Sequence, residues 1–140
     1  MSYLLDTNVV SEVRRPRAAA QVAAWFESVP SDQLFISALV LGEIGRGVER
    51  LRRRGDLGQA VIFEHWLGDV RQRFAGQVVP IDGPVTEEWG RIDATAPTPV
   101  EDALMAATAI VHGMVFVTRN VGHVASTGVR VLNPWEPPPG

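Results

Sequence analysis

Three acidic residues stand at positions where alternating strands and helices can bring them together. Asp6 follows the apolar residues 3–5, Glu43 interrupts the apolar stretch 34–44, and Asp102 begins an apolar helix over residues 103–111. A charged side chain beside buried apolar surface costs solvation free energy unless it is paired or bound to a metal. The sequence offers these three acids no obvious basic partner nearby, so it predicts a divalent-cation site and metal-assisted chemistry.

The chemistry that suits such a site is hydrolysis at phosphorus. Carboxylate oxygens at the strand ends are the hard ligands that Mg²⁺ or Mn²⁺ prefers. A bound cation can activate a water as nucleophile and offset the negative charge that forms on a phosphate. Without a cation, crowded carboxylates repel one another and each pKa rises.

Each acid also has a purely structural interpretation. Asp6 can make a turn or cap a helix, Asp102 can complement the dipole of its helix, and Glu43 can lie at the rim of a buried stripe. The joint pattern favours the metal site over three separate explanations. Short polar residues near the predicted strand ends can orient carboxylates and water or cap turns; they are Thr7, Ser11, Thr118 and Asn120.

The elements that must position these residues alternate along the chain. Strands are expected at residues 2–6, 34–36, 77–81, 114–117 and 129–132. Helices are expected at residues 7–16, 18–28, 38–53, 57–74, 84–93 and 102–112. This alternation predicts an α/β fold of three layers (α/β/α), with a central five-stranded parallel sheet flanked by helices. Ligands of such sheets bind beyond the carboxyl ends of the strands.

Local signals define the helix that carries Glu43 and the one that carries Asp102. Ser37 can cap the helix over residues 38–53, and Glu43 lies beside its apolar stripe rather than opposite it. Gly113 can end the Asp102 helix. The tryptophans, including Trp66, occur at helical spacing and are expected in the core.

The bulk composition bounds the class of protein. The 140 residues fit one domain, expected over residues 1–135 with a proline-rich tail at 136–140. There is no cysteine, so disulfides, thiolate metal sites and a cysteine nucleophile are excluded. The N-terminus lacks the features of a signal peptide, and the apolar run 34–41 is far shorter than the roughly 20 residues of a membrane-spanning helix. We expect a soluble cytoplasmic protein without a membrane partner.

The basic residues are all arginine and are clustered, although the net charge is −3. One cluster is Arg14, Arg15 and Arg17, and the other runs from Arg46 to Arg54. Guanidinium groups suit phosphate contacts, and local basic patches steer polyanions even on an acidic protein. The second cluster can equally solvate a helix end and complement its dipole, so both interpretations stay open.

Four segments together resemble a known family. Residues 4–12 (LLDTNVVSE), 37–44 (SALVLGEI), 99–109 (PVEDALMAATA) and 117–121 (VTRNV) resemble PIN-domain proteins of the VapC toxin type, and residues 128–135 (GVRVLNPW) resemble their ending. The resemblance runs in order over essentially the whole chain. It implies a Mg²⁺-dependent endoribonuclease, with Mn²⁺ as a substitute, that is the toxin of a type II toxin–antitoxin pair. It also implies a homodimer and inhibition by a VapB-like antitoxin.

The resemblance assigns expected roles to individual residues. Asp6, Glu43 and Asp102 match the acidic residues of the family, with Asp6 and Asp102 as direct metal ligands. Its polar supporting residues are matched by Asn8, Ser11, Thr118 and Asn120. Glu43 would position or deprotonate water, and RNA, in single strands or loops, would be guided by Arg14, Arg15 and Arg46.

One departure from the family pattern concerns His123. Many relatives carry an aspartate three residues after the asparagine of the Thr-Arg-Asn segment, and here that position is His123. A neutral imidazole does not supply the missing negative charge, although it can bind Mn²⁺ or act as an acid or base. The alternative is that His123 is a spectator and three acids suffice. A second metal ion is correspondingly in question.

Other functions compete with metal-dependent cleavage. A catalytically weak scaffold that binds RNA or a protein partner without cutting is the main alternative. A haloacid-dehalogenase phosphatase is disfavoured because Asn8 stands where its second aspartate is expected. A dinucleotide-binding enzyme is disfavoured because no Gly-x-Gly-x-x-Gly turn follows the first strand. The helical hairpin over residues 38–74 can offer an apolar groove to an amphipathic helix of a partner.

Overall fold

A five-stranded parallel sheet forms the centre of the molecule. The computed structural model describes residues 1–137, and its strands lie in the order β3-β2-β1-β4-β5. All four strand pairs are parallel. The strands are β1 (Tyr3–Leu5), β2 (Leu34–Ser37), β3 (Val78–Val79), β4 (Val115–Val117) and β5 (Val131–Leu132).

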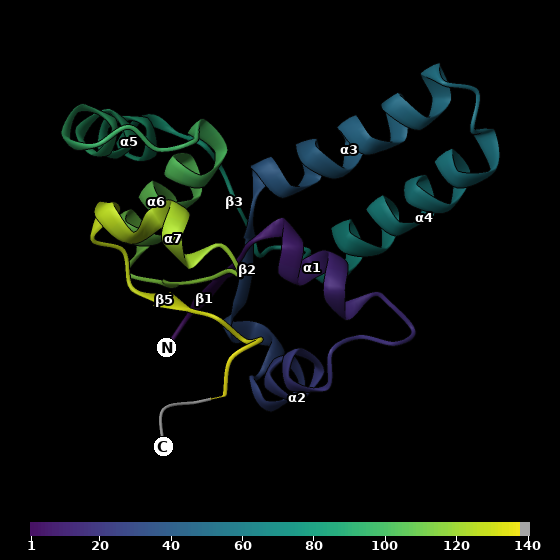
Figure 1. The fold of residues 1–140 in the computed structure, drawn as a ribbon, viewed down its shortest axis with the longest axis horizontal. Helices are drawn as coiled ribbons and strands as arrows, with labels where there is room; N and C mark the ends of the chain where they lie inside the picture. The colour runs from purple at the N-terminus through teal and green to yellow at the C-terminus, as the bar shows by residue number, and fades with distance from the viewer. Residues whose placement is uncertain (138–140) are drawn as a thin grey trace.

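Helices lie on both sides of this sheet. Figure 1 shows α5, α6 and α7 on one side, and α1 with the long α3–α4 hairpin on the other. The α-helices are α1 (Thr7–Val13), α2 (Ala20–Ser28), α3 (Ala38–Arg53), α4 (Leu57–Arg73), α5 (Gly83–Thr95), α6 (Val100–His112) and α7 (Val121–Val124). Two short 3₁₀ helices occupy Ser31–Gln33 and Ala125–Thr127. The predicted three-layer α/β/α architecture is confirmed.

The differences from the predicted elements are local. The first helix ends at Val13 instead of near residue 16, and β3 and β5 are only two residues long. The sequence reading missed α7, a single turn over residues 121–124. One turn is too short to display a helical period of apolar residues, and its Gly122 is a poor helix former.

The helix that carries Glu43 forms as expected. The hydroxyl of Ser37 accepts a hydrogen bond from the backbone amide of Leu39 at 3.1 Å, which caps the start of α3. Its buried residues recur every three or four positions, as a helix packed on a core requires; they are Val40, Ile44, Val48 and Leu51. The helix of Asp102 ends at Gly113, whose φ of +65° favours glycine.

The core lies around the two central strands. Leu4 and Leu5 on β1, and Phe116 and Val117 on β4, have no exposed surface. Because their side chains are packed on every side, the carboxyl ends of these two strands are held at fixed positions.

Two further expectations concern the ends of the chain and the membrane. Within residues 1–137, no helix combines the length and the apolar character that crossing a bilayer demands. The predicted division into a domain over residues 1–135 and a tail at 136–140 stays a prediction, and from residue 138 the tail lies outside the described residues.

Candidate functional site

The register of the two central strands brings Asp6 and Thr118 together. Leu5 on β1 pairs with Val117 on β4, so the next residue of each strand, Asp6 and Thr118, lies at the same edge of the sheet. The backbone amide of Asp6 donates to the carbonyl of Val117 at 2.9 Å and continues this pairing. Asp6 is only 6% exposed and Thr118 is fully buried. A buried carboxylate is therefore held at the carboxyl end of the sheet.

The carboxylate of Asp6 accepts three hydrogen bonds. The hydroxyl of Thr118 donates to Oδ2 at 2.7 Å and the amide of Asn8 to the same oxygen at 3.3 Å. The backbone amide of Thr7 donates to Oδ1 at 2.7 Å, so Asp6 also caps α1. The backbone amide of Asn120 donates to the Thr118 hydroxyl at 3.0 Å. Asp6 therefore caps a helix, and the same position places its carboxylate where the metal site is expected.

The topology places the other two acids at the same edge of the sheet. Helix α3 starts directly after β2, so Glu43 lies in its second turn beyond the carboxyl end of that strand. Helix α6 leads into β4 and runs back along it, so Asp102 in its first turn lies at the carboxyl end of β4. Both side chains are partly buried.

Burial and charge act together on the pKa of Asp6. Burial raises its pKa above the usual value, and the negative charge of Asp102 adds to the rise. The Thr118 hydroxyl, the Thr7 amide and the charge of His123 oppose it. The influence of Asp102 on Asp6 indicates that these two carboxylates, 96 positions apart in sequence, are electrostatic neighbours.

Glu43 responds to its surroundings in the same direction. Burial raises its pKa most, and the charges of Asp6 and Glu101 raise it further. The nearby Thr7 hydroxyl and Arg46 partly oppose the shift. The Thr7 hydroxyl oxygen is itself buried and makes no hydrogen bond of normal geometry. The charge of Asp102 therefore acts on Asp6, and the charge of Asp6 acts on Glu43.

His123 contacts one of the three acids, Asp102. Its Nδ1 atom lies 3.1 Å from Oδ2 of Asp102, and its side chain is 55% exposed. The contact comes from α7, the turn that the sequence pattern did not reveal. The imidazole therefore lies against the carboxylate of Asp102.

A cleft of about 250 Å³ opens beside Glu43. It lies between α1, α3 and α4, and it is lined by Thr7, Ser11, Glu43, Ile44, Arg46, Gly47, Arg50, Phe63 and Trp66. Two arginines, two aromatic rings and one of the three acids therefore share a single surface.

The three arginines expected near RNA lie in different surroundings. Arg46 lines the cleft and pairs with Glu101 at 3.2 Å. Arg14 lines a separate cavity of about 500 Å³ and lies over the ring of Trp66 at 4.5 Å. Arg15 is exposed and pairs with Glu12 at 3.4 Å. Of these three residues, only Arg46 lines the same cleft as Glu43.

The donor atoms of the site suit a hard divalent cation. The three acids offer only oxygen, and the buried side-chain oxygen of Asn8 has no hydrogen-bond partner among residues 1–137. Carboxylates such as Asp6 and Glu43, whose pKa is raised by a neighbouring negative charge, are stabilised as anions by a cation placed among them. Among residues 1–137, no three side chains of histidine, aspartate or glutamate are close enough to form a ready-made metal site.

The raised pKa of Glu43 makes a prediction about stability. Between the ordinary value of 4.5 and the raised value, the folded state holds more protons than the unfolded chain. The free energy of unfolding therefore falls as pH rises through this window and stays lower above it. Because glutamine removes the charge, we expect Glu43→Gln to melt at a higher temperature than the parent at pH 7.5 in chelator.

The control for this prediction is the low-pH limit. Below pH 4 the carboxyl group is protonated in both states, so the difference between the two proteins should largely disappear. Thermal unfolding followed by circular dichroism at both pH values measures the effect. A parent protein that is more stable than Glu43→Gln at pH 7.5 would show that the carboxylate is stabilising there, against the direction of the pKa shift.

Sequence reasoning missed part of the cleft. Trp66 packs against the core, as expected, and it also lines the cleft together with Phe63. The sequence pattern places Arg50 in one cluster that runs from Arg46 to Arg54. In the structure Arg46 and Arg50 line the cleft, and Arg52, Arg53 and Arg54 do not. The spacing of four between Arg46 and Arg50, which places both on one helix face, is the signal that identifies the pair.

Comparison with known proteins gives a consistent result. The model of the PIN domain matches residues 3–125. The toxin FitB of Neisseria gonorrhoeae is 34% identical over 137 residues, which cover 94% of this chain and 97% of FitB. The VapC ribonuclease Y4jK of Sinorhizobium fredii is 32% identical over 96% of this chain and 98% of its own.

A solved structure agrees with these sequence matches. The crystal structure of FitAcB from Neisseria gonorrhoeae contains a chain that superposes with a TM-score of 0.84 at 32% identity, over 95% of this chain and 98% of that one. The sheet order, the acidic group at its carboxyl edge and the match over residues 3–125 lead to one conclusion. This chain belongs to the PIN domain family.

Proposed function

We propose that this protein is a divalent-metal-dependent endoribonuclease that acts in the cytoplasm as the toxin of a type II toxin–antitoxin module. The observation that supports it most is the group of Asp6, Glu43 and Asp102 at the carboxyl end of the sheet. The similarity to a protein named VapC ribonuclease supports the same reaction. The preferred cation is Mg²⁺, with Mn²⁺ as a substitute.

In this proposal the chain's own groups have separate tasks. Asp6 and Asp102 hold the cation, and the Thr118 hydroxyl and the Asn8 amide fix the orientation of Asp6. Glu43 lies on the cleft side, where it positions a water molecule or takes a proton from it. Its raised pKa brings it closer to neutral pH, which suits a general base. When bound, the cation supplies a Lewis acid that offsets the charge developing on the phosphate.

The substrate in this proposal is single-stranded or looped RNA. Its backbone and bases are accessible, whereas those of an A-form helix are largely hidden in its grooves. Arg46 is placed to contact the phosphate backbone, because its guanidinium lies at the cleft that Glu43 lines. Arg14 and Arg15, which do not line that cleft, are candidates for contacts further along the strand.

Removing the metal tests the enzymatic part of the proposal. We expect cleavage of a structured RNA with single-stranded loops to stop in excess chelator and to return when Mg²⁺ or Mn²⁺ is added back. Gel electrophoresis of end-labelled RNA measures both. Full activity in chelator would exclude metal-dependent cleavage, and binding of the RNA without cleavage under any metal would favour the alternative, a PIN-like scaffold that does not cut.

The proposal also includes two protein partners. One is a second copy of the chain in a homodimer, and the other is a VapB-like antitoxin that blocks the site. The similar solved structures include one described as a complex of FitAB with a DNA fragment and another described as a toxin–antitoxin complex from Klebsiella pneumoniae. The exposed apolar side chains of Leu57, Val61 and Ile62 on α4 suit contact with an amphipathic helix of such a partner.

Co-expression tests the toxin part. We expect the chain alone to arrest bacterial growth, and we expect co-expression with the protein encoded beside it to restore growth and to yield a stable complex on purification. The assignment would be contradicted if growth arrest persisted on co-expression and the neighbouring protein did not co-purify with the chain. The Asp6→Asn variant is the control, because it should bind the partner and yet fail to arrest growth.

A further inference from the structure

The cleft beside Glu43 combines features that the proposed reaction has not used. We propose that it is a subsite for one nucleotide of single-stranded RNA next to the bond that is cut, with Arg50 contacting a phosphate and Phe63 and Trp66 contacting the base. This inference rests on the proposed function, because it names how that same site receives its substrate.

Charge is the first part of the argument. Arg46 and Arg50 are four residues apart on α3 and therefore lie on one face of the helix, along the cleft. Arg52, Arg53 and Arg54 each pair with a carboxylate, at 2.8 to 3.9 Å. Among residues 1–137, Arg50 has no carboxylate within 4.0 Å. A guanidinium that faces a cleft without an acidic partner is suited to a phosphate.

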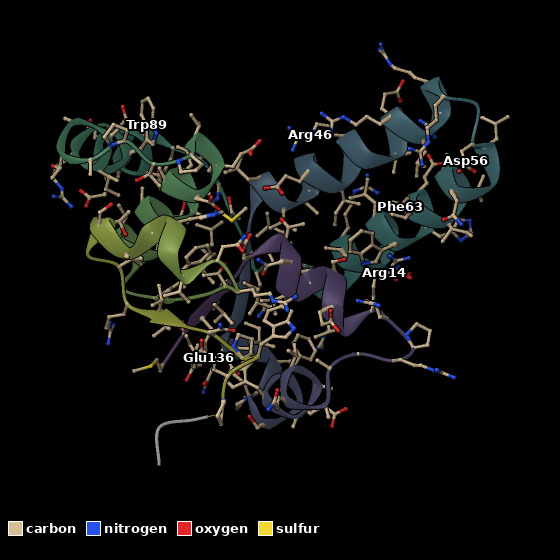
Figure 2. All side chains as sticks on the ribbon, viewed as in Figure 1. Arg14, Arg46, Asp56, Phe63, Trp89 and Glu136 are labelled. Carbon is tan, nitrogen blue, oxygen red and sulfur yellow. The ribbon has the colours of Figure 1, made fainter. Side chains whose placement is uncertain are left out.

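The aromatic wall is the second part. Phe63 and Trp66 meet edge to face, with ring centroids 5.7 Å apart, and both line the cleft. Arg14 lies over both rings, at 5.2 and 4.5 Å, and lines the larger neighbouring cavity. Figure 2 shows Arg14 and Phe63 close together between α1 and α4. Arg14 therefore holds the pair in place and covers one side of each ring, so a base would contact the part of the rings that lines the cleft.

The polar end of the cleft is the third part. Among residues 1–137, the buried Thr7 hydroxyl oxygen has no hydrogen bond of normal geometry, and Ser11 adds a second hydroxyl to the lining. Ser11 lines the same cleft as Glu43, so its hydroxyl can contact a sugar or a base edge close to the reacting phosphate. A ribose 2′-hydroxyl can both donate to and accept from such groups, which favours RNA over DNA.

Size limits what the cleft can accept. Its volume of about 250 Å³ is below the roughly 300–1,000 Å³ of pockets for drug-sized ligands. One nucleobase with its sugar suits this space, and a packed helix of a partner does not. The joint presence of free cationic and aromatic side chains also matches how single-stranded nucleic acid is bound.

The test compares two arginines on the same helix. Both substitutions are made in the Asp6→Asn background, so that a fluorescein-labelled short single-stranded RNA of mixed sequence stays intact in Mg²⁺. Arg50→Ala removes a charge inside the cleft, whereas Arg53→Ala removes the same charge from a residue that is 80% exposed and pairs with Glu49. Fluorescence anisotropy at several salt concentrations gives the affinity and its salt dependence.

We expect Arg50→Ala to weaken RNA binding roughly tenfold and to lower the slope of log affinity against log salt by about 0.7, the value for one phosphate contact on a single strand. Arg53→Ala should change either quantity far less. A fold defect does not reproduce this result, because it does not lower the slope by the amount that corresponds to one phosphate contact.

A second variant tests the aromatic wall. Phe63→Leu keeps apolar bulk and removes the ring, so the α3–α4 packing is retained. RNAs that carry 2-aminopurine at successive positions around the cut should show one position whose fluorescence is quenched by the protein. We expect Phe63→Leu to restore most of that fluorescence while the anisotropy still reports binding.

The results that would contradict the RNA subsite differ from those that would contradict the proposed function. Equal RNA affinities and salt slopes for Arg50→Ala and Arg53→Ala would overturn the subsite. If Arg50→Ala spares RNA but prevents capture of the neighbouring gene's protein, the cleft binds a peptide and the subsite is again overturned. Failure of the parent protein to bind or cut RNA in Mg²⁺ would instead refute the proposed function itself.

Discussion

Asp6→Asn is expected to reduce RNA cleavage at least about a hundredfold while the protein stays folded. Substitutions that only orient a metal ligand already cost roughly 10- to 100-fold, and Asp6 is proposed as a ligand itself. Asparagine has the same shape, keeps an oxygen for the Thr7 amide and removes a buried charge whose pKa is raised chiefly by burial. Initial rates of cleavage, measured beside thermal unfolding, check both halves of the prediction.

The matched control for Asp6→Asn is Asp93→Asn. This substitution makes the same chemical change at an exposed position of α5, a helix that carries none of the three acids. Asp93→Asn should cleave RNA at the parent rate. A folded Asp6→Asn protein that also cleaves at the parent rate would remove Asp6 from the catalytic group and, with it, the proposed metal site.

Thr118→Val is expected to slow cleavage by roughly 10- to 100-fold and to destabilise the fold by about 1–3 kcal/mol. Valine fills the same fully buried space but removes the hydroxyl that donates to Asp6 at 2.7 Å. It also leaves the backbone amide of Asn120 without its acceptor. The rate loss arises because the Asp6 carboxylate is no longer held in one orientation.

The pH profile distinguishes this mechanism from a general loss of stability. The Thr118 hydroxyl lowers the pKa of Asp6, so its removal raises that pKa further. Since Asp6 is needed as an anion, the acidic limb of the cleavage profile should move to higher pH in Thr118→Val. Thr118→Ser keeps the hydroxyl, so its acidic limb should lie at the same pH as in the parent protein. An acidic limb at the parent pH in Thr118→Val would contradict the proposed role of the hydrogen bond.

The sequence was sufficient to predict the elements whose signals are local. The buried stripe and the Ser37 cap define α3 as residues 38–53, as the structure has it, and Gly113 ends α6 because it adopts a positive φ. The alternation of strands and helices predicts the parallel sheet. The carboxyl edge of that sheet follows from the topology, which is why Asp6, Glu43 and Asp102 could be expected at one place.

What the sequence could not supply depends on contacts between distant segments. The pairing of His123 with Asp102 joins α7 to α6, and a single turn such as α7 has no periodicity to detect. The cleft needs α1, α3 and α4 at the same time. Helical spacing predicts that Trp66 packs against the core, as it does, but spacing alone does not show that the same ring also lines an open cleft.

The most direct test of the central claim is anomalous diffraction from crystals soaked in Mn²⁺. We predict an anomalous peak in contact with the carboxylates of both Asp6 and Asp102, and no peak there in crystals of Asp102→Asn. A parent crystal that shows no ion at these two carboxylates, from protein that cleaves RNA in the same Mn²⁺ buffer, would contradict the account.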